Sequence, residues 1–398
     1  MERPIDIRRR QLMLTGVAAA GLGMSRGALA QQEASKPKPL PKYAAWKDSD
    51  SVIVHSSNTI ETKRSAFGTS VIVPNDILFV RNNLSPPEES ITHDPDAWEL
   101  TVEGTGKPGK LTVAQLKRLG VESIGAVLQC SGNGRGFFKH KPSGTPWTVG
   151  AAGCVVWSGV PVAAVAKAMG GVAGGMQFIT ATGGERIPAG VDPKTVVVER
   201  SVPMKEMENA LLAWELNGER LPLAHGGPLR LVIPGYYGIN NVKYVSRLAF
   251  TAQETEANIQ ATNYRLTEVG KKPTPREPPV WEMNVKSWIN HPAGDAPVNA
   301  GMVQIDGVAF SSLHPVKKVE VSIDGGKSWK EARFFGPDLG RYAWRQFVFP
   351  VELGAGNYVL VSRATDAAGN TQPVEPVENS LGYAHNGWRD HGVRLTVA

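Results

Sequence analysis

The stretch 128–138 holds the residues best suited to chemistry. An apolar run ends at Cys130, and polar and glycine residues follow, with Arg135 five positions beyond the sulfur. This order predicts a buried strand that delivers a cysteine to a loop, where glycine lets the backbone approach a large ligand. A nearby cation lowers the pKa of a thiol, and the thiolate is the form that binds metal. The stretch predicts a metal-binding thiolate, with a structural cysteine as the alternative.

The chain of 398 residues has only one other cysteine, Cys154. In an oxidising compartment a disulfide between Cys130 and Cys154 is therefore an open alternative. The sequence contains no C-x-x-C-H segment and no C-x-x-C pair. We therefore expect no covalently attached haem, and no zinc or iron–sulfur site built on such a pair.

Cations also occur on successive loops around glycine. His225 and Arg230 bound one loop, and Lys243 follows in the next. Such a set suits an anionic ligand with several phosphate or keto oxygens. The glycine spacing matches neither a Walker A nor a Rossmann fingerprint. Arg81 lies near the end of the run 76–83, and taken by itself its position favours a solvated charge at a strand end.

The elements that position these loops follow from local periodicity. We expect strands at 76–83, 98–104, 177–181, 195–199 and 231–234. Helices are expected at 112–119, with Thr112 as N-cap, and at 162–169, which a glycine pair ends. The segment 210–216 fits either a helix or a strand.

The character of the chain changes after the proline-rich linker 271–279. Short alternating or apolar segments follow, with turns at 324–326 and 366–370. We expect strands at 301–310, 316–323, 329–334, 343–349 and 357–364. This spacing is typical of an immunoglobulin-like β-sandwich, here without a cysteine and suited to packing or dimerisation.

The first 30 residues have the features of a targeting segment. Paired arginines precede Gln11-Leu12-Met13, an uncharged run extends to Met24, and Ala28-Leu29-Ala30 offers a cleavage site. The run is too short to span a bilayer comfortably. The pattern resembles a twin-arginine signal, with an ordinary secretory signal as the alternative. It predicts a periplasmic protein, with an extended N-terminal arm at 31–50.

Length and composition indicate an ordinary globular protein, and its charge shows whether nucleic acid is a plausible partner. The chain carries a formal net charge of +6. The signal segment contributes about half of it, because its five Arg outnumber Glu2 and Asp6. The remaining bias is too mild for a nucleic-acid-binding protein. The length suits two domains.

Taken together, these motifs resemble the sulfite oxidase family of molybdenum enzymes. The likeness rests on the segments 79–83, 130–135, 225–230 and 240–243 and on the late β-sandwich, in that order, and it extends over 52–398. It is greatest to the bacterial periplasmic sulfite dehydrogenases, which lack the fused haem domain of animal sulfite oxidase. The resemblance implies an α+β fold: a molybdopterin-binding catalytic domain at 51–275, then an immunoglobulin-like β-sandwich at 280–398.

The resemblance also implies a role for individual residues. Cys130 would be the one protein ligand to molybdenum, beside a single pterin. Arg81 and Arg135 would line an anion pocket. Trp147 would belong to the same pocket, and Tyr264 would orient substrate or aid electron flow. The expected cofactor-binding residues are Asn82, Asn83, His225, Arg230, Asn241, Val242 and Lys243.

Two departures from the family pattern stand out. Asn83 occupies a position where the animal enzymes have histidine, so a proton-handling role there is lost. The animal enzymes also carry a third pocket arginine early in the sandwich, whereas the segment 311–317 has none. His314 or Lys317 could take its place.

The reaction implied is two-electron oxidation of sulfite to sulfate, with electrons passed to an external c-type cytochrome. We expect a homodimer or a heterodimer with a cytochrome subunit, and neither nucleic acid nor membrane as partner. One alternative is a sulfane dehydrogenase subunit of a thiosulfate-oxidising complex. A reductase of S-oxides fits less well, because the β-sandwich is present. A non-catalytic periplasmic binding module with a Cys130–Cys154 disulfide is the alternative from another class.

Overall fold

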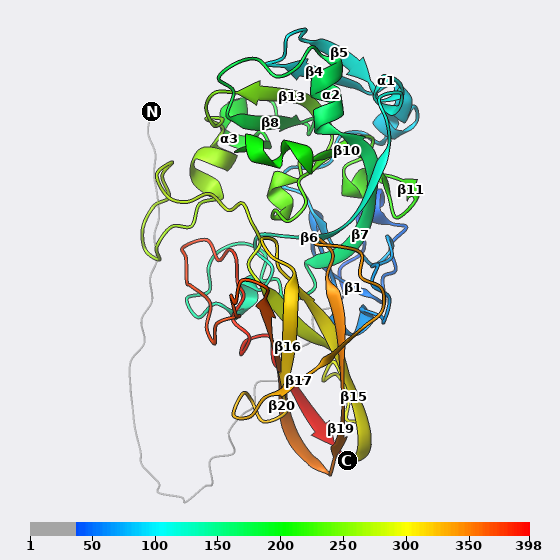
Figure 1. Cartoon of the computed structure of the whole chain (residues 1–398), viewed down its shortest axis with the longest axis vertical. Helices are drawn as coiled ribbons and strands as arrows, with labels where there is room; N and C mark the ends of the chain where they lie inside the picture. Colours follow the sequence, from blue (N-terminus) through cyan, green and yellow to red (C-terminus); the bar gives the residue numbers. More distant parts are fainter. Residues whose placement is uncertain (1–36) are drawn as a thin grey trace, which may run out of the picture. The chain divides into compact units, whose positions relative to one another are not determined.

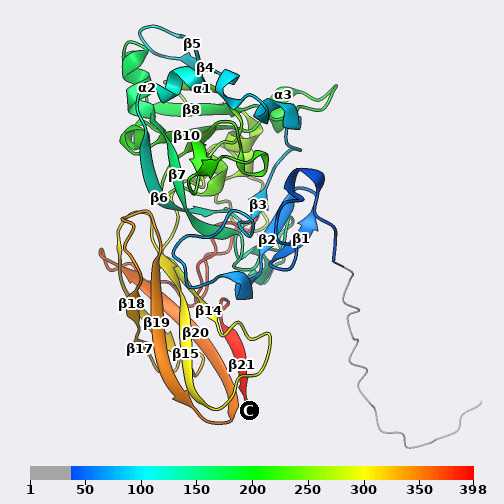
Figure 2. The ribbon, with the colours of Figure 1, turned by 90° about the vertical axis from the view of Figure 1, so that its right-hand side faces the viewer.

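The computed structural model describes residues 37–398, so the predicted signal segment at 1–30 lies outside the described residues. Five β-sheets and a few short helices make up this part (Figures 1 and 2). The α+β class and the immunoglobulin-like sandwich predicted from sequence are confirmed. None of the described helices is both long and apolar enough to cross a membrane.

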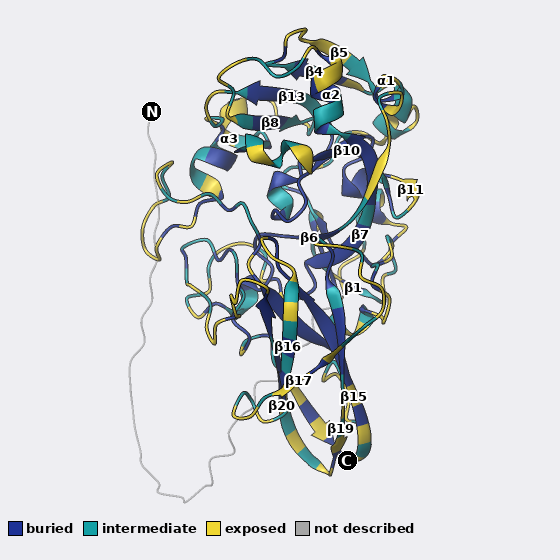
Figure 3. Ribbon diagram, in the orientation of Figure 1, coloured by how far each residue is buried: buried dark blue, intermediate teal, exposed yellow. Residues whose placement is uncertain are grey.

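The sheet that carries the cysteine has the strand order β11-β10-β7-β6, and β12 also pairs with β10. Its strands are β6 (Glu122–Gln129), β7 (Ala152–Pro161), β10 (Leu211–Leu216), β11 (Glu219–Arg220) and β12 (Arg230–Val232). Strand β6 is exposed where it begins and buried over its last four residues. It therefore enters the core at its carboxyl end, directly before Cys130. Figure 3 shows β7 as buried along much of its length.

A second sheet has the order β5-β4-β13-β8-β9. Its strands are β4 (Glu99–Glu103), β5 (Gly109–Thr112), β8 (Phe178–Gly183), β9 (Glu199–Pro203) and β13 (Val245–Thr251). Two helices accompany it, α1 (Val113–Lys117) and α2 (Val162–Ala168), both close to the predicted positions. Thr112 caps α1 as expected, in a capping box with Gln115.

The strand predicted at 195–199 is wrong. Asp192 accepts a hydrogen bond from the Lys194 amide, and a proline follows it, so this segment begins a short helix, α3 (Pro193–Val196). Strand pairing starts only at Glu199.

A small N-terminal sheet joins β1 (Val52–Ser56), β2 (Thr59–Thr62) and β3 (Val80–Arg81). The strand expected at 76–83 is thus reduced to its end, because the Ile77 and Leu78 amides bond back to the Pro74 carbonyl in a turn. The described part of the predicted arm is not extended either. It forms a 3₁₀ helix, η1 (Lys42–Ala44), and buries Ala44 and Lys47.

The sandwich consists of two four-stranded sheets, β14-β15-β19-β18 and β17-β16-β20-β21. Their strands are β14 (Lys286–His291), β15 (Gly301–Phe310), β16 (Val316–Ser322), β17 (Lys330–Glu331), β18 (Arg333–Phe335), β19 (Arg345–Leu353), β20 (Gly356–Asp366) and β21 (Val393–Val397). The single strand expected at 329–334 is wrong, because the chain passes from one sheet to the other at Ala332. Sequence analysis missed β14 and β21.

The sandwich also supports the cysteine loop. Trp288 and Trp344 share one hydrophobic core with the buried end of β6. The Lys286 ammonium donates to the Asn133 carbonyl at 3.1 Å, and the Ala384 amide donates to the Ser131 carbonyl at 2.9 Å. Residues far along the chain therefore fix the loop that follows Cys130.

The domain boundary predicted between 275 and 280 stays a prediction, because residues 37–398 form one compact unit.

Candidate active site

Cys130 directly follows β6, with its thiol free and 8% of its surface exposed. Cys154 is also free and wholly buried in β7, and burial raises the pKa of its thiol to about 12. Cys154 pairs with Val127, three residues before Cys130. At roughly 3.3 Å per residue this offset is about 10 Å, beyond the reach of a disulfide. The disulfide alternative is therefore wrong, and Cys130 remains available as a thiolate ligand.

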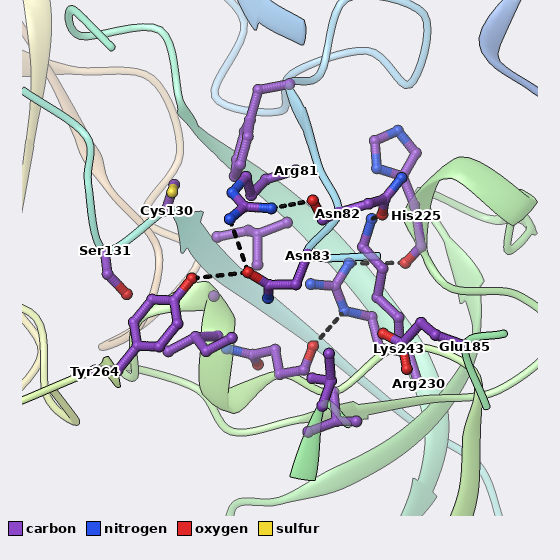
Figure 4. Close-up of a pocket in the computed structure, with 17 residues that line it drawn as sticks. Arg81, Asn82, Asn83, Cys130, Ser131, Glu185, His225, Arg230, Lys243 and Tyr264 are labelled. Carbon is purple, nitrogen blue, oxygen red and sulfur yellow. Dashed lines mark hydrogen bonds between the residues drawn. The ribbon is translucent and has the colours of Figure 1, made fainter. Parts of the chain in front are cut away.

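Cys130 opens into a pocket that is walled by several elements far apart in the sequence. All the predicted site residues except Arg135 and Trp147 line it. The walls are formed by Phe79, Arg81, Asn82, Asn83, Leu128, Cys130, Ser131, Glu185, Val198, His225, Arg230, Gly238, Ile239, Asn241, Val242, Lys243 and Tyr264. In Figure 4, Cys130, Ser131 and Tyr264 lie on one side, while His225, Arg230, Lys243 and Glu185 gather on the other.

Arg81, Asn83 and Tyr264 form one hydrogen-bonded group in this pocket. The Asn83 Oδ1 atom accepts from Arg81 Nη2 at 2.7 Å and from the Tyr264 hydroxyl at 3.1 Å (Figure 4). Burial opposes the charge of Arg81, but the Tyr264 hydroxyl and the Cys130 sulfur more than offset it and raise the pKa of the guanidinium. Arg81 is therefore a fixed cation near the thiol, suited to binding an oxyanion.

The opposite side concentrates cationic residues. Arg230 donates to the carbonyls of His225 at 2.7 Å and Asn241 at 3.1 Å, and burial lowers its pKa to about 9. Burial, then the neighbouring Arg230, holds the pKa of Lys243 well below its ordinary value. The nearby Glu185 carboxyl offsets the effect on Lys243 only in part. An anion such as a phosphate would relieve both groups.

Two amides connect these cations to the frame. Asn82 accepts from Lys243 Nζ at 2.6 Å. Asn241 accepts from the Ile233 amide at 2.7 Å and donates to the Tyr236 carbonyl at 3.2 Å, so its side chain holds the loop in shape. Any contact of Asn241 or Val242 with a ligand would thus rest mainly on the backbone.

Glu185 lines the pocket, and sequence analysis missed it. Its Oε2 atom is buried and has no hydrogen-bond partner among residues 37–398. Burial raises the pKa of this carboxyl to about 7. The residue follows Gly183-Gly184 at the end of β8, and a glycine pair at a strand end was the one available signal. Such a carboxyl can accept hydrogen bonds from the amino or ring N–H groups of a ligand.

Arg135 does not line the pocket. Its Nε donates to the Leu381 carbonyl at 3.0 Å, and the guanidinium lies 5.2 Å from the centre of the Tyr383 ring. Tyr383 in turn stacks on Tyr264 at 4.9 Å. Arg135 therefore supports the pocket through two tyrosine rings, and its catalytic role stays a prediction. Tyr383 lies so far along the chain that local patterns gave no sign of it.

Trp147 and the candidates for a third cation also lie elsewhere. Trp147 is wholly buried behind Phe79, with ring centroids 6.4 Å apart, and its role also stays a prediction. His314 and Lys317 are both exposed and do not line the pocket. The described pocket thus contains one arginine, Arg81, on the side of Cys130.

The pocket suits a metal held mostly by a cofactor. Residues 37–398 contain no cluster of three or more His, Cys, Asp or Glu that could hold a metal ion by themselves. A metal at Cys130 would therefore need further ligands from a bound organic group, and a soft thiolate suits molybdenum. Arg230 and Lys243, on the same side of the pocket as His225, fit a phosphate. The Glu185 carboxyl, whose Oε2 atom has no partner among residues 37–398, fits a ring with N–H donors. The donor set present therefore fits a phosphorylated pterin.

Comparison with known proteins agrees with this donor set. The oxidoreductase molybdopterin binding domain matches residues 87–259, and the Mo-co oxidoreductase dimerisation domain matches 277–397. Sulfite oxidase of Gallus gallus is 30% identical over 335 residues, which are 80% of this chain and 72% of that protein. Mitochondrial sulfite oxidase of Homo sapiens is 31% identical over 353 residues, which are 82% of this chain and 62% of that protein.

A solved structure extends the likeness to nearly the whole chain. The sulfane dehydrogenase SoxCD from Paracoccus pantotrophus superimposes with a TM-score of 0.72 at 25% sequence identity. The alignment covers 95% of this chain and 96% of that chain.

Proposed function

This chain belongs to the sulfite oxidase family of molybdenum oxidoreductases, and we propose that it oxidises sulfite to sulfate and passes the electrons to an external c-type cytochrome. It binds a molybdenum–molybdopterin cofactor and acts on sulfur compounds. The observation that carries the proposal is the free thiol of Cys130 opening into a pocket that the charged side chain of Arg81 also lines.

The residues of the pocket divide the work by their chemistry. Cys130 would hold the metal, while Arg230, Lys243 and Glu185 would hold the pterin and its phosphate. The bound cofactor would supply oxygen-atom transfer and accept two electrons. Arg81 would bind and orient the sulfite oxyanion through charge-assisted hydrogen bonds. Tyr264 and Arg81 share the Asn83 oxygen, so the hydroxyl of Tyr264 is held toward the same anion.

We further propose that the protein works in the periplasm after export by the twin-arginine route. The proposal rests on the sequence of the first 30 residues. A haem iron takes up one electron at a time, so in this proposal the two electrons leave the cofactor in two successive steps. The predicted dimerisation domain suits association with a second copy or with a cytochrome subunit.

A second candidate function is sulfane dehydrogenation, as a subunit of a thiosulfate-oxidising complex. Two observations favour it: the structural match to SoxCD over 95% of the chain, and the presence of only one arginine, Arg81, on the Cys130 side of the described pocket. A small dianion would be held less firmly by one arginine than by several. A sulfur chain carried on a larger partner would depend less on such a cluster.

A direct assay separates the two candidates. Purified, molybdenum-loaded protein is mixed with oxidised cytochrome c, and cytochrome reduction is followed with sulfite or with a protein-bound sulfane as donor. Sulfite oxidation predicts rapid reduction with sulfite alone. Activity confined to the sulfane donor would replace the first proposal with the second, and molybdenum-free protein from the same host would overturn both.

A further inference from the structure

The short segment 43–47 packs behind the cation side of the pocket. It belongs to the predicted N-terminal arm, yet Ala44 is wholly buried in a small core that also contains Val80 of β3 and Ala224 of the 3₁₀ helix η7 (Leu223–His225). Both of these elements carry predicted cofactor-binding residues at their ends, Asn82 and His225. The segment 43–47, here called the N-terminal buttress, thus joins two walls of the pocket.

Lys47 is the centre of the N-terminal buttress. The residue is 4% exposed, and its ammonium group meets three acceptors: the carbonyls of Asn75 and Leu78, each at 2.7 Å, and His225 Nε2 at 3.2 Å. An ammonium has three N–H donors, so these contacts use all of them. Burial lowers the pKa of Lys47 to about 7, and the nearby Asp76 carboxylate partly offsets that effect.

The contact fixes the state of His225. Burial, followed by the charges of Lys47 and Lys243, keeps the pKa of this imidazole well below its ordinary value. While Lys47 is protonated its ammonium can only donate, so Nε2 of His225 accepts and the ring proton lies on Nδ1. Trp46 covers the pair from outside, with its ring centroid 6.0 Å from that of His225.

Tyr43 makes a parallel connection at the other wall. Its hydroxyl accepts from Asn82 Nδ2 at 3.2 Å and donates to the Ser57 carbonyl at 2.6 Å. The same Asn82 side chain accepts from Lys243 Nζ, which also donates to the Ala224 carbonyl at 2.6 Å. The N-terminal buttress therefore reaches two of the cofactor-binding residues through side-chain hydrogen bonds.

We propose that Lys47, supported by Tyr43, is a positioning residue that holds His225 and Asn82 in the arrangement that retains the pterin cofactor. Neither residue lines the pocket, so the effect is transmitted through His225 and Asn82. The inference rests on the cofactor of the proposed function and not on the substrate that it oxidises.

The test compares Lys47→Met, which keeps the length of the side chain but removes its donors, with Lys42→Met as the control. Lys42 lies in the same segment and is exposed. Two quantities are measured: the rate of molybdenum loss below the unfolding temperature, and the difference in unfolding temperature between loaded and cofactor-free protein. That difference reports cofactor binding separately from the stability of the fold.

We expect Lys47→Met to lose molybdenum on the order of tenfold faster than the wild-type protein. The difference in unfolding temperature between loaded and cofactor-free protein should also be smaller in this variant than in the wild type. Lys42→Met should match the wild type. If Lys47→Met lowers both unfolding temperatures equally and keeps the wild-type rate of molybdenum loss, the residue is structural only and the inference is overturned. Should that variant not fold, the same measurements on Tyr43→Phe decide, with a faster loss expected and an unchanged rate overturning the proposal.

Failure of this inference can be told from failure of the proposed function. A wild-type protein that retains molybdenum but does not oxidise sulfite would overturn only the function. A wild-type protein without molybdenum would overturn both.

Discussion

Arg81→Gln tests how the pocket recognises its anion. In the structure the guanidinium is fixed by the Asn82 carbonyl and the Asn83 side chain, and it retains further N–H donors for a ligand. A hydrogen bond to a charged group contributes about 1.5–3 kcal/mol, so kcat/KM for sulfite should fall by about 10- to 150-fold. We expect most of this fall to come from a higher KM, with molybdenum content unchanged, because Arg81 binds the anion rather than the metal.

Steady-state reduction of cytochrome c at varied sulfite concentration measures this effect. Arg118→Gln is a matched control, since Arg118 is exposed at the end of α1, away from the pocket lining. Arg81→Lys should lose less than Arg81→Gln, because it keeps the charge but not the planar fork. An unchanged KM in a fully loaded Arg81→Gln protein would refute the assignment of Arg81 to anion binding.

Three further variants probe the site and the fold. Cys130→Ser should fold normally, judged by circular dichroism, but show no sulfite turnover, and full turnover would defeat its assignment as the metal ligand. Burial raises the pKa of Glu185 from 4.5 to about 7, so cofactor-free protein should lose on the order of 3 kcal/mol of stability as pH rises through this interval. Urea unfolding of cofactor-free Glu185→Gln should show no such loss of stability as the pH rises. If the variant and the wild-type protein lose stability equally over this pH interval, the assignment is contradicted. Thr112→Ala should lower the free energy of unfolding by about 1 kcal/mol without changing turnover, while an unchanged urea midpoint would show that the cap is not stabilising.

The sequence was most informative where function depends on local order along the chain. Cys130 follows a buried strand directly, and His225, Arg230 and Lys243 lie at the ends of neighbouring short elements, so their patterns could be read without tertiary contacts. Thr112 and its capping box are equally local. Strand and helix preferences therefore predicted the frame that carries these residues.

Long-range contacts account for what the sequence did not reveal. Lys47 meets His225 across 178 residues, and Tyr383 stacks on Tyr264 from the loop between β20 and β21. Glu185 is a candidate ligand-binding residue because its buried Oε2 atom has no hydrogen-bond partner among residues 37–398. The spacing of residues along the sequence does not reveal this property. The resemblance placed Arg135 in the pocket lining, but a contact with the Leu381 carbonyl, 246 residues along the chain, holds its side chain elsewhere.

The central claim is that the Cys130 thiolate binds molybdenum beside a single pterin. X-ray absorption at the molybdenum edge counts the sulfur atoms bound to the metal and so tests that claim directly. We predict one more sulfur neighbour in the wild-type protein than the pterin can supply, and the absence of that neighbour in Cys130→Ser. A wild-type spectrum in which the pterin accounts for every bound sulfur would contradict the assignment.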